Sequence, residues 1–332
     1  MPRPYPHAAV MTDSNPLLQS IGDRAAWSAL LARVRRDTLE QSWAYGEAVA
    51  AVSRTRPERW LLLDGNGETI GLAQAFRRRF AAFGSLVRIV RGPLFLPGIE
   101  RAARLAALGA LRQQYRWRQN PSQGRSVLWW LPELPGGAES ETLMRELGLE
   151  QMVTGWSSVR LDLTPAPAVL RGQLDGKWRN ALKAAERSPL LLDESWDDTT
   201  FATVMRAHDV QRIEKRFLGP DGAFYRAFAA AADPALGDSA HLFTAKIGTR
   251  PVAGMLLLRH GRGATYAAGW SSEPGRLVRA HHRLLWHGLL ALKNLGVEHF
   301  DLGGANTEEG AGVARFKLGL NGEVFTLAGS FA

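Results

Sequence analysis

The chain has 332 residues, 45% of them hydrophobic, and no cysteine, which excludes disulfides, thiol catalysis and zinc–thiolate sites. This length predicts about two domains, and the absence of any run of about 18 apolar residues predicts no transmembrane helix. The formal net charge of +9 suits polyanions such as tRNA, anionic lipid headgroups or substrates that carry a pyrophosphate. A basic surface without a specific partner explains the charge equally well.

The first half of the chain predicts a tail and one mixed unit of helices and strands. Residues 1–20 are rich in proline and polar residues and predict a flexible tail. The Gly-Asn-Gly turn at 65–67 lies between two apolar runs and predicts a hairpin. Around it we expect helices over 23–35, 41–52, 100–116 and 139–147, and strands over 60–64, 69–76, 83–90 and 126–131.

The second half repeats this order of elements. We expect strands over 157–163, 241–247, 252–258 and 263–270, and helices over 168–187, 198–216 and 221–232. A loop over 271–278 then leads into a long helix over 279–296.

The last of these units is the most informative. Leucines recur at helical spacing over 279–296, and Gly296 predicts the end of that helix. A short apolar strand follows and ends at Asp301, and the glycines at 303–304 predict a turn into a loop that carries Arg315 and Lys317. Such a unit places charged groups at one end of a sheet, where α/β folds tend to keep their sites.

This order of helix, glycine, strand ending in Phe-Asp-Leu-Gly-Gly, and Gly-x-x-x-Phe-Lys resembles the C-terminal signature of the FemABX family. Those enzymes extend the peptidoglycan interpeptide bridge and belong to a superfamily of acyltransferases with tandem GNAT-like domains. Three further stretches resemble family segments, and all four together cover roughly residues 40–322 in the family's order. They are residues 41–46 (Gln-Ser-Trp-Ala-Tyr-Gly), 91–95 (Arg-Gly-Pro-Leu-Phe), and 161–163 (Leu-Asp-Leu) followed by 177–187.

The resemblance implies an α/β (α+β) fold of two tandem GNAT-like domains, over residues 21–155 and 156–332. Each would contain a mixed, mainly antiparallel sheet flanked by helices. The implied activity is non-ribosomal aminoacyl transfer from aminoacyl-tRNA to an amino group of a peptidoglycan precursor peptide, in cell-wall synthesis and cell shape. The N-terminus lacks the apolar segment of a signal peptide, so we expect a cytoplasmic protein, free or in peripheral contact with the inner face of the membrane.

The same resemblance names the residues of the site. Lys317 of the Phe-Lys motif would stabilise the oxyanion or the leaving ribose oxygen. Asp301 would position the acceptor amine or accept its proton, and capping of the Gly303–Gly304 turn explains it equally well. The implied substrate-binding residues are Arg212, Tyr266, Trp270, Arg315 and Phe316.

A further set of basic residues is expected to contact phosphate or tRNA: Lys177, Arg179, Lys183, Arg276 and Arg279. A solvated helix face is the simpler explanation for the first three. Neither a cofactor nor a metal is expected, because His281 and His282 are adjacent and have no partner four residues on. Aminoacyl-tRNA and a lipid-linked or nucleotide-linked muropeptide are the expected partners.

Two alternatives stay open. An N-acyltransferase on the same fold would use acyl-CoA or acyl carrier protein, although residues 271–280 lack the usual pyrophosphate-binding pattern and contain Glu273. A basic binding module for nucleic acid or membrane, without catalysis, is the second alternative.

Overall fold

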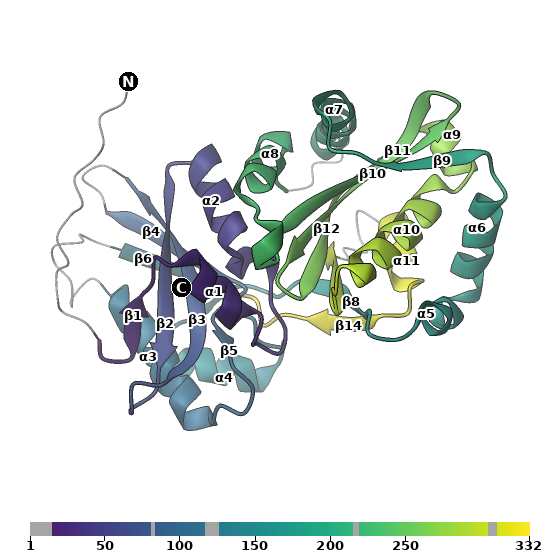
Figure 1. Cartoon of the computed structure of the whole chain (residues 1–332). Coiled ribbons are helices and arrows are strands. Elements are labelled where there is room, and N and C mark those ends of the chain that lie inside the picture. The colour runs from purple at the N-terminus through teal and green to yellow at the C-terminus, as the bar shows by residue number, and fades with distance from the viewer. Residues whose placement is uncertain (1–14, 81–83, 117–125, 215–218, 305–310) are drawn as a thin grey trace, which may run out of the picture.

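The computed structural model describes residues 15–80, 84–116, 126–214, 219–304 and 311–332. These residues form two mixed sheets, each flanked by helices, and the sheets lie next to each other (Figure 1). Both sheets are antiparallel except for one parallel pair each, β4–β6 and β12–β13. The expected fold class is confirmed.

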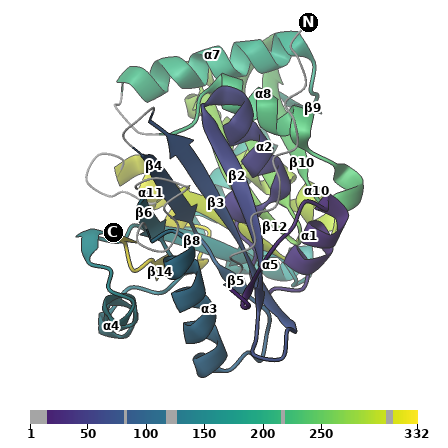
Figure 2. The same cartoon turned by 90° about the vertical axis from the view of Figure 1, so that its left-hand side faces the viewer.

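Figure 2 shows the molecule with the half that contains the first sheet facing the viewer. Helices α3 (Arg101–Gln114) and α4 (Ala138–Glu146) pack on one face around Trp130, and α1 (Arg24–Leu31) packs on the other through Trp27. Its strands, in spatial order, are β1 (Leu18–Ser20), β2 (Thr55–Leu63), β3 (Thr69–Arg79), β4 (Ser85–Val90), β6 (Ser126–Leu131), β15 (Ser330–Phe331) and β7 (Gln151–Val153), with β5 (Leu94–Phe95) beside β3.

The second sheet carries helices on both faces. One face holds α5 (Pro167–Gln173), α6 (Gly176–Glu186), α9 (Glu273–Leu277), α10 (Ala280–Asn294) and α11 (Ala311–Leu318), and the other α7 (Asp198–Glu214) and α8 (Gly222–Ala231). A short helix η5 (Pro234–Leu236) precedes β10. The strands, in spatial order, are β14 (Glu323–Thr326), β8 (Ser157–Asp162), β13 (His299–Gly304), β12 (Gly263–Ser271), β11 (Arg250–His260), β10 (Ser239–Ile247) and β9 (Leu190–Glu194).

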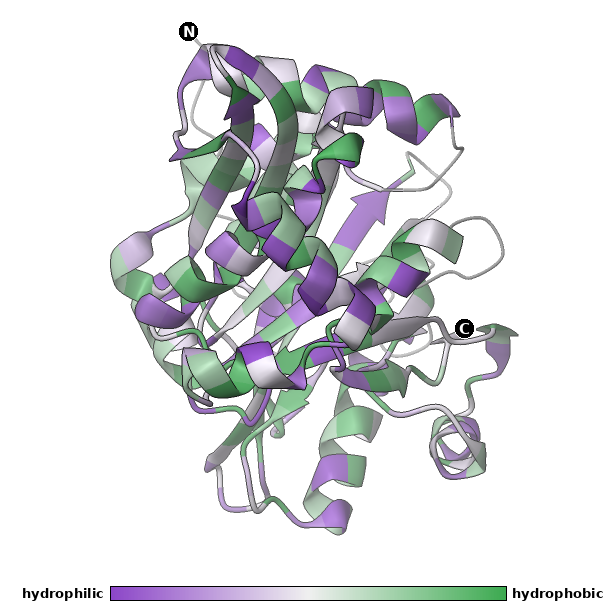
Figure 3. Ribbon diagram, turned by 90° about the vertical axis from the view of Figure 1, so that its right-hand side faces the viewer, coloured by the Kyte–Doolittle hydropathy of each residue, from purple (hydrophilic) through white to green (hydrophobic). Residues whose placement is uncertain are grey.

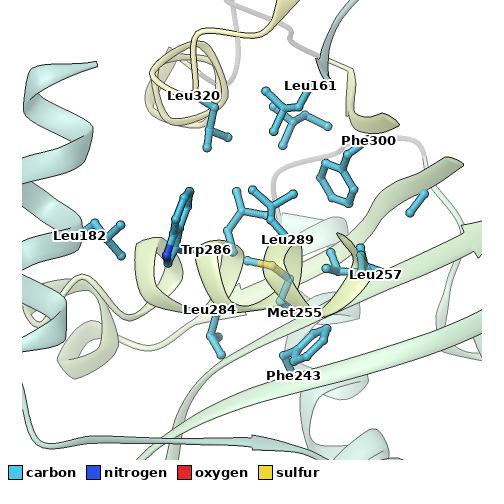
Figure 4. Packing of buried hydrophobic residues seen from close by; sticks show 14 of the residues in the cluster. Leu161, Leu182, Phe243, Met255, Leu257, Leu284, Trp286, Leu289, Phe300 and Leu320 are labelled. Carbon is cyan, nitrogen blue, oxygen red and sulfur yellow. The ribbon is translucent and has the colours of Figure 1, made fainter. Parts of the chain in front are cut away.

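The apolar periodicity of the long helix produces the main core of the second sheet. Leu284 and Leu289 of α10 pack onto Phe243 and Leu257 of the sheet, and all four side chains are buried (Figure 4). Hydrophilic and hydrophobic residues alternate along the surrounding helices, as a half-buried helix requires (Figure 3). This packing fixes α10 against the strands that end at the candidate site.

Several contacts join the halves, and two of them involve whole elements. The C-terminal strand β15 pairs with β6 and β7 of the first sheet, although it follows the second sheet in the chain. Helix α2 (Trp43–Val52), preceded by η1 (Leu39–Gln41), packs against α8 of the second half, where the Tyr45 and Phe224 rings lie 5.2 Å apart. The expected boundary at residues 155 and 156 falls between β7 and β8.

The structure differs from the sequence-based expectation in several places, of which three bear on the site and the chain ends. Residues 18–20, expected within a flexible tail, form β1 against β2, while residues 1–14 lie outside the described residues. The helix expected over 168–187 is two helices, because Asp175 caps the second one by accepting from the backbone N–H of Lys177. Arg315 and Lys317 lie on α11 and not on a loop.

No helix of the described residues has both the length and the apolar character that a membrane crossing requires.

Candidate functional site

The two parallel strands of the second sheet separate before their carboxyl ends. They pair at three positions: Gly263 with His299, Ala264 with Phe300, and Thr265 with Asp301. Beyond this point β12 has a bulge at Ala267, because Tyr266 and Ala268 oppose the consecutive residues Leu257 and Leu256. The last carbonyl groups of β13 are therefore left for partners other than β12.

Lys317 of α11 supplies that partner. Its Nζ donates to the carbonyl oxygens of Gly304 at 2.7 Å and Gly303 at 3.2 Å, and its side chain is only 7% exposed. Burial lowers the pKa of Lys317 to about 8, and the nearby Asp301 carboxylate partly opposes this shift. An ammonium has three N–H groups, so one remains after these two bonds to the described residues.

Asp301 lies beneath the same turn. Its Oδ1 accepts from the backbone N–H of Gly303 at 2.9 Å and lies 2.6 Å from the Ser158 hydroxyl, and its Oδ2 accepts from Arg91 at 2.7 Å. Burial alone would raise the pKa of Asp301, but Arg91 and these hydrogen bonds lower it. A carboxylate so well stabilised is a weak base, so the geometry favours the turn-capping interpretation.

Aromatic residues surround the lysine on the α10 side. The Lys317 Nζ lies 5.6 Å from the centre of the Tyr266 ring, and the Tyr266 hydroxyl lies 3.1 Å from His281 Nε2. The Phe316 ring contacts both His281 and His282 edge-on, and the Trp178 indole donates to the Phe316 carbonyl. The structure thus brings together three residues predicted from the sequence, namely Tyr266, Phe316 and Lys317.

The ionisable groups in this cluster are held neutral, with the exception of the lysine. Burial lowers the pKa of His281 and of His282 to about 4, and it raises the pKa of Tyr266. Near neutral pH the Lys317 ammonium is therefore the charged group of this aromatic cluster. Nδ1 of His281 is buried and has no hydrogen-bond partner among the described residues.

Arg315 is not part of this cluster. It is exposed and lies two positions before Lys317 on the same helix, and residues at that spacing do not share a helix face. A role for Arg315 in substrate binding stays a prediction for a ligand that reaches the outside of α11.

Arg212 and Trp270 lie on the opposite face of the sheet from Tyr266. Trp270 pairs across the strands with Gly254, a residue that faces Val204 of α7, and Arg212 of α7 lies 3.6 Å from the Asp209 carboxylate. Within the described ranges, neither residue has a hydrogen bond, ion pair or ring contact with Lys317.

The three basic residues of α6 lie along a helix that spans the distance from α11 to α10. Its first turn meets α11 through Trp178, and its last turn meets α10, where Arg283 donates to the carbonyls of Ala185 and Ser188. Lys177 and Lys183 are exposed, whereas Arg179 donates to the Gly172 carbonyl.

Arg276 lies in the last turn of α9, and Arg279 directly precedes α10. Arg279 precedes the helix in a left-handed conformation, with φ of 58°, and no side chain caps the first turn of α10. Arg276 donates to the Ser271 carbonyl and both arginines are exposed. The loop expected over 271–278 contains α9, whose N-terminus is capped by the Ser272 hydroxyl.

Sequence reasoning missed two polar residues that contact Asp301. Ser158 of β8 carried no signal, because a serine in a strand is unremarkable until its neighbours are known. Arg91 belongs to the Arg-Gly-Pro segment that resembles the family, but nothing in the sequence pairs it with an aspartate 210 positions away.

Two hollows lie at the seam between the sheets, away from this cluster. They measure about 600 and 850 Å³, and both are lined by Arg35, Arg36, Arg160 and Glu323. Lys317 and Asp301 line neither hollow. Among the described residues, no group of three or more histidine, aspartate or glutamate side chains is arranged to hold a metal ion. We place the candidate site at Lys317 because a buried cation, aromatic side chains and the carboxyl end of β13 coincide there.

The comparisons with known proteins agree with this architecture. Residues 171–318 match the model of the acetyltransferase (GNAT) domain, and this match supports an acyltransferase. A search of the curated proteins finds no match to the sequence.

Solved structures with similar folds cover nearly the whole chain. FemX is similar with a TM-score of 0.77 and 15% identity, over 95% of this chain and 96% of FemX. A tandem GNAT protein from the clavulanic acid biosynthesis pathway follows with 0.54 and 14%, over 95% and 97% of the two chains. L-PGS from Bacillus licheniformis has values of 0.50 and 12%, over 88% of each chain. At such low sequence identities, these structural similarities show the fold alone, which is a tandem GNAT fold.

Proposed function

We propose that this acyltransferase moves an amino acid from aminoacyl-tRNA to an amino group of a peptidoglycan precursor peptide. The observation that carries the proposal is the geometry of Lys317. Its buried ammonium donates two N–H groups to the carbonyls of Gly303 and Gly304, and a third N–H group remains for a ligand. In a poorly solvated site, a fixed cation of this kind stabilises developing negative charge far more than it would in water.

The reaction needs a positioned cation and little else. The acceptor amine attacks the ester carbonyl of the donor, a C–N bond forms, and the carbonyl oxygen becomes an oxyanion that the free N–H of Lys317 can bind. The C–O bond to the ribose then breaks, and the proton lost by the amine goes to the ribose oxygen. Because the ester is already activated, neither ATP nor a metal enters the balance.

The basic surface supports a polyanionic donor. Lys177 and Lys183 are exposed on α6, Arg276 is exposed on α9, and Arg279 is exposed directly before α10. Together with the net charge of +9, these side chains offer phosphate contacts near the Lys317 cluster. The similarity in fold to FemX, over 95% of this chain, supports an aminoacyl donor and a peptidoglycan precursor as the acceptor.

A second candidate, transfer from acyl-CoA, is favoured by one observation. The first turn of α10 has no side-chain cap and is flanked by Arg276 and Arg279, which suits a pyrophosphate. Glu273 in the first turn of the adjacent α9 opposes this candidate, because its carboxylate would repel a phosphate.

An amide-forming assay with two donor arms tests the proposal. Purified protein receives a pool of muropeptide precursors together with either charged tRNA or a set of acyl-CoAs, and amide products are identified by mass spectrometry. We expect product only with charged tRNA, whereas product only with acyl-CoA would establish the second candidate. Binding of tRNA without product in either arm would favour a non-catalytic module.

Matched lysine variants separate catalysis from folding in the productive arm. Lys317→Met should lower the rate by about 100-fold or more, as does the loss of one oxyanion donor elsewhere. Lys293 is the control, because its Nζ also binds two backbone carbonyls, of Leu163 and Thr164, but at the far end of α10. Lys293→Met should therefore retain the wild-type rate.

A further inference from the structure

Arg91 belongs to the first half of the chain, and its side chain contacts the candidate site in the second half. It follows β4, is 3% exposed and has a φ of 50°, a left-handed conformation that a residue with a side chain adopts at an energetic cost. Its backbone is fixed on both sides, since its N–H donates to the Leu131 carbonyl and its carbonyl accepts from the Thr38 hydroxyl. The fold therefore holds this side chain in one direction.

The Arg91 guanidinium joins a carboxylate from each half of the chain. Its Nε and Nη2 donate to the two oxygens of Glu133, at 2.8 and 3.0 Å, and its Nη1 donates to Asp301 at 2.7 Å. Trp156 and Phe325 of the second half flank the guanidinium. This use of the rigid fork is specific to arginine, because a lysine cannot bind two carboxylates in fixed directions.

A continuous series of contacts leads from Asp301 to the catalytic lysine. The Asp301 Oδ1 accepts from the Gly303 N–H, and the carbonyls of Gly303 and Gly304 accept from Lys317 Nζ at 3.2 and 2.7 Å. Gly303 has a φ of 69°, and the Ser158 hydroxyl lies 2.8 Å from its carbonyl oxygen as well as 2.6 Å from Asp301 Oδ1, so Asp301 and Ser158 together hold the turn toward the lysine. The orientation of the ammonium thus depends on where Asp301 is held.

We propose that Arg91 is a positioning residue: by fixing Asp301 it holds the Gly303–Gly304 turn, and through that turn the Lys317 ammonium, in the geometry for transfer. This inference rests on the proposed role of Lys317. It makes the first half of the chain a part of the reacting centre, because the correct placement of Lys317 requires the two sheets to be docked.

The simpler explanation is that Arg91 only joins the two halves. Arg160 provides the matched control for this explanation, because it is also buried, also binds Glu133, at 3.2 Å, and has no hydrogen bond to Asp301. Glu40, whose pKa is raised by burial, is a further titratable group next to Arg91. A purely structural role would make Arg91 and Arg160 variants behave alike.

The test measures the ionisation of Lys317 directly and needs no substrate. The chain contains six lysines, so protein with ¹³Cε-labelled lysine gives few signals, and Lys317→Met identifies the one of interest. The full-length wild type, Arg91→Met, Arg91→Lys and Arg160→Met are titrated by NMR from about pH 6 to 11, a range that brackets the lysine transition. Thermal unfolding of each variant checks the fold.

We expect the wild-type Lys317 signal to titrate near pH 8. In Arg91→Met the Asp301 carboxylate loses its cation and attracts the ammonium more strongly, so the midpoint should rise by about one pH unit, or tenfold in the ionisation constant. Arg160→Met should give a clearly smaller rise, because Arg160 interacts with Asp301 through charge but has no hydrogen bond to it. Arg91→Lys should give a smaller rise, and this variant carries the test if Arg91→Met does not fold.

An unchanged midpoint in the folded Arg91 variants would overturn the inference, as would an equal shift in Arg160→Met. Because the titration is independent of any donor or acceptor, the contact series from Arg91 to Lys317 can stand even if the transfer assay fails. Conversely, transfer by the wild type together with an unchanged Lys317 midpoint in the Arg91 variants would leave the proposed function intact and refute the positioning role.

Discussion

Lys317 shows how burial changes the ionisation of a residue type that usually lies on the protein surface. A lysine 7% exposed and placed against two carbonyls and a tyrosine ring loses most of its hydration, which lowers its pKa to about 8. The sequence motif singled out this residue, but the motif could not reveal the burial or its two carbonyl partners. Those depend on β13 and α11 meeting in space.

The lowered pKa predicts a pH-dependent stability. Because the unfolded lysine titrates near 10.5 and the folded one near 8, the unfolded state binds more protons between these values. The free energy of unfolding of the wild type should therefore rise relative to that of Lys317→Met as pH increases from about 8 to 10.5, by on the order of 2–3 kcal/mol. Urea unfolding of both proteins across this range measures it, and a constant difference would contradict the burial.

At the scale of elements, the helix–strand–turn unit of residues 279–304 was predictable, because its leucine spacing and its glycines are local signals. Helix α11 was not, because it has eight residues, contains Gly312 in its first turn and is followed by Gly319, a pattern that is typical of loops. The bulge at Ala267 and the early separation of β12 from β13 are also invisible in the sequence. They arise from pairing with β11, far away in the chain.

Gly269 of β12 gives a test at this scale. A Cβ at this position would overlap the Tyr266 hydroxyl and lie 2.8 Å from His281 Nε2, so the tyrosine can occupy its place only over a glycine. Gly269→Ala should displace Tyr266 and lower the transfer rate by about tenfold or more, since a misplacement of about 1 Å is known to reduce rates strongly.

Gly109→Ala is the control for that variant. A Cβ in the middle of α3 would meet only the Leu147 side chain, at 4.0 Å, so this change should keep the full rate and stabilise the protein by about 0.5–1 kcal/mol. Equal rates for the two alanine variants would show that Tyr266 does not need its present position.

For the molecule as a whole, the tandem order of elements was predictable, but the return of the C-terminal strand to the first sheet was not. The last strand, Ser330–Phe331, returns to the first sheet, and two residues carry too little pattern to predict a strand or its partner. Likewise, the contact between Arg91 and Asp301 joins residues 210 positions apart. The candidate site thus depends on both halves, although its motif lies in the second.

The return of the C-terminus predicts that Phe331 stabilises the first half. Its ring is 1% exposed and packs in the core with Trp130, so Phe331→Ala should lower the free energy of unfolding by about 3–5 kcal/mol. Val153→Ala on the neighbouring β7 is the control, because Val153 is exposed and should change stability by about 0.5 kcal/mol or less. Denaturant unfolding distinguishes them, and equal effects would refute the role of β15.

The most direct test of the account is the pH dependence of the transfer rate with the donor that gives product. If the Lys317 ammonium binds the oxyanion, the active form dominates below its pKa of about 8 and is lost above it. The wild-type kcat/KM should therefore descend above pH 8, and Lys317→Met should be slower by about 100-fold and lack this descending limb. A descending limb that survives in Lys317→Met would contradict the central role of Lys317.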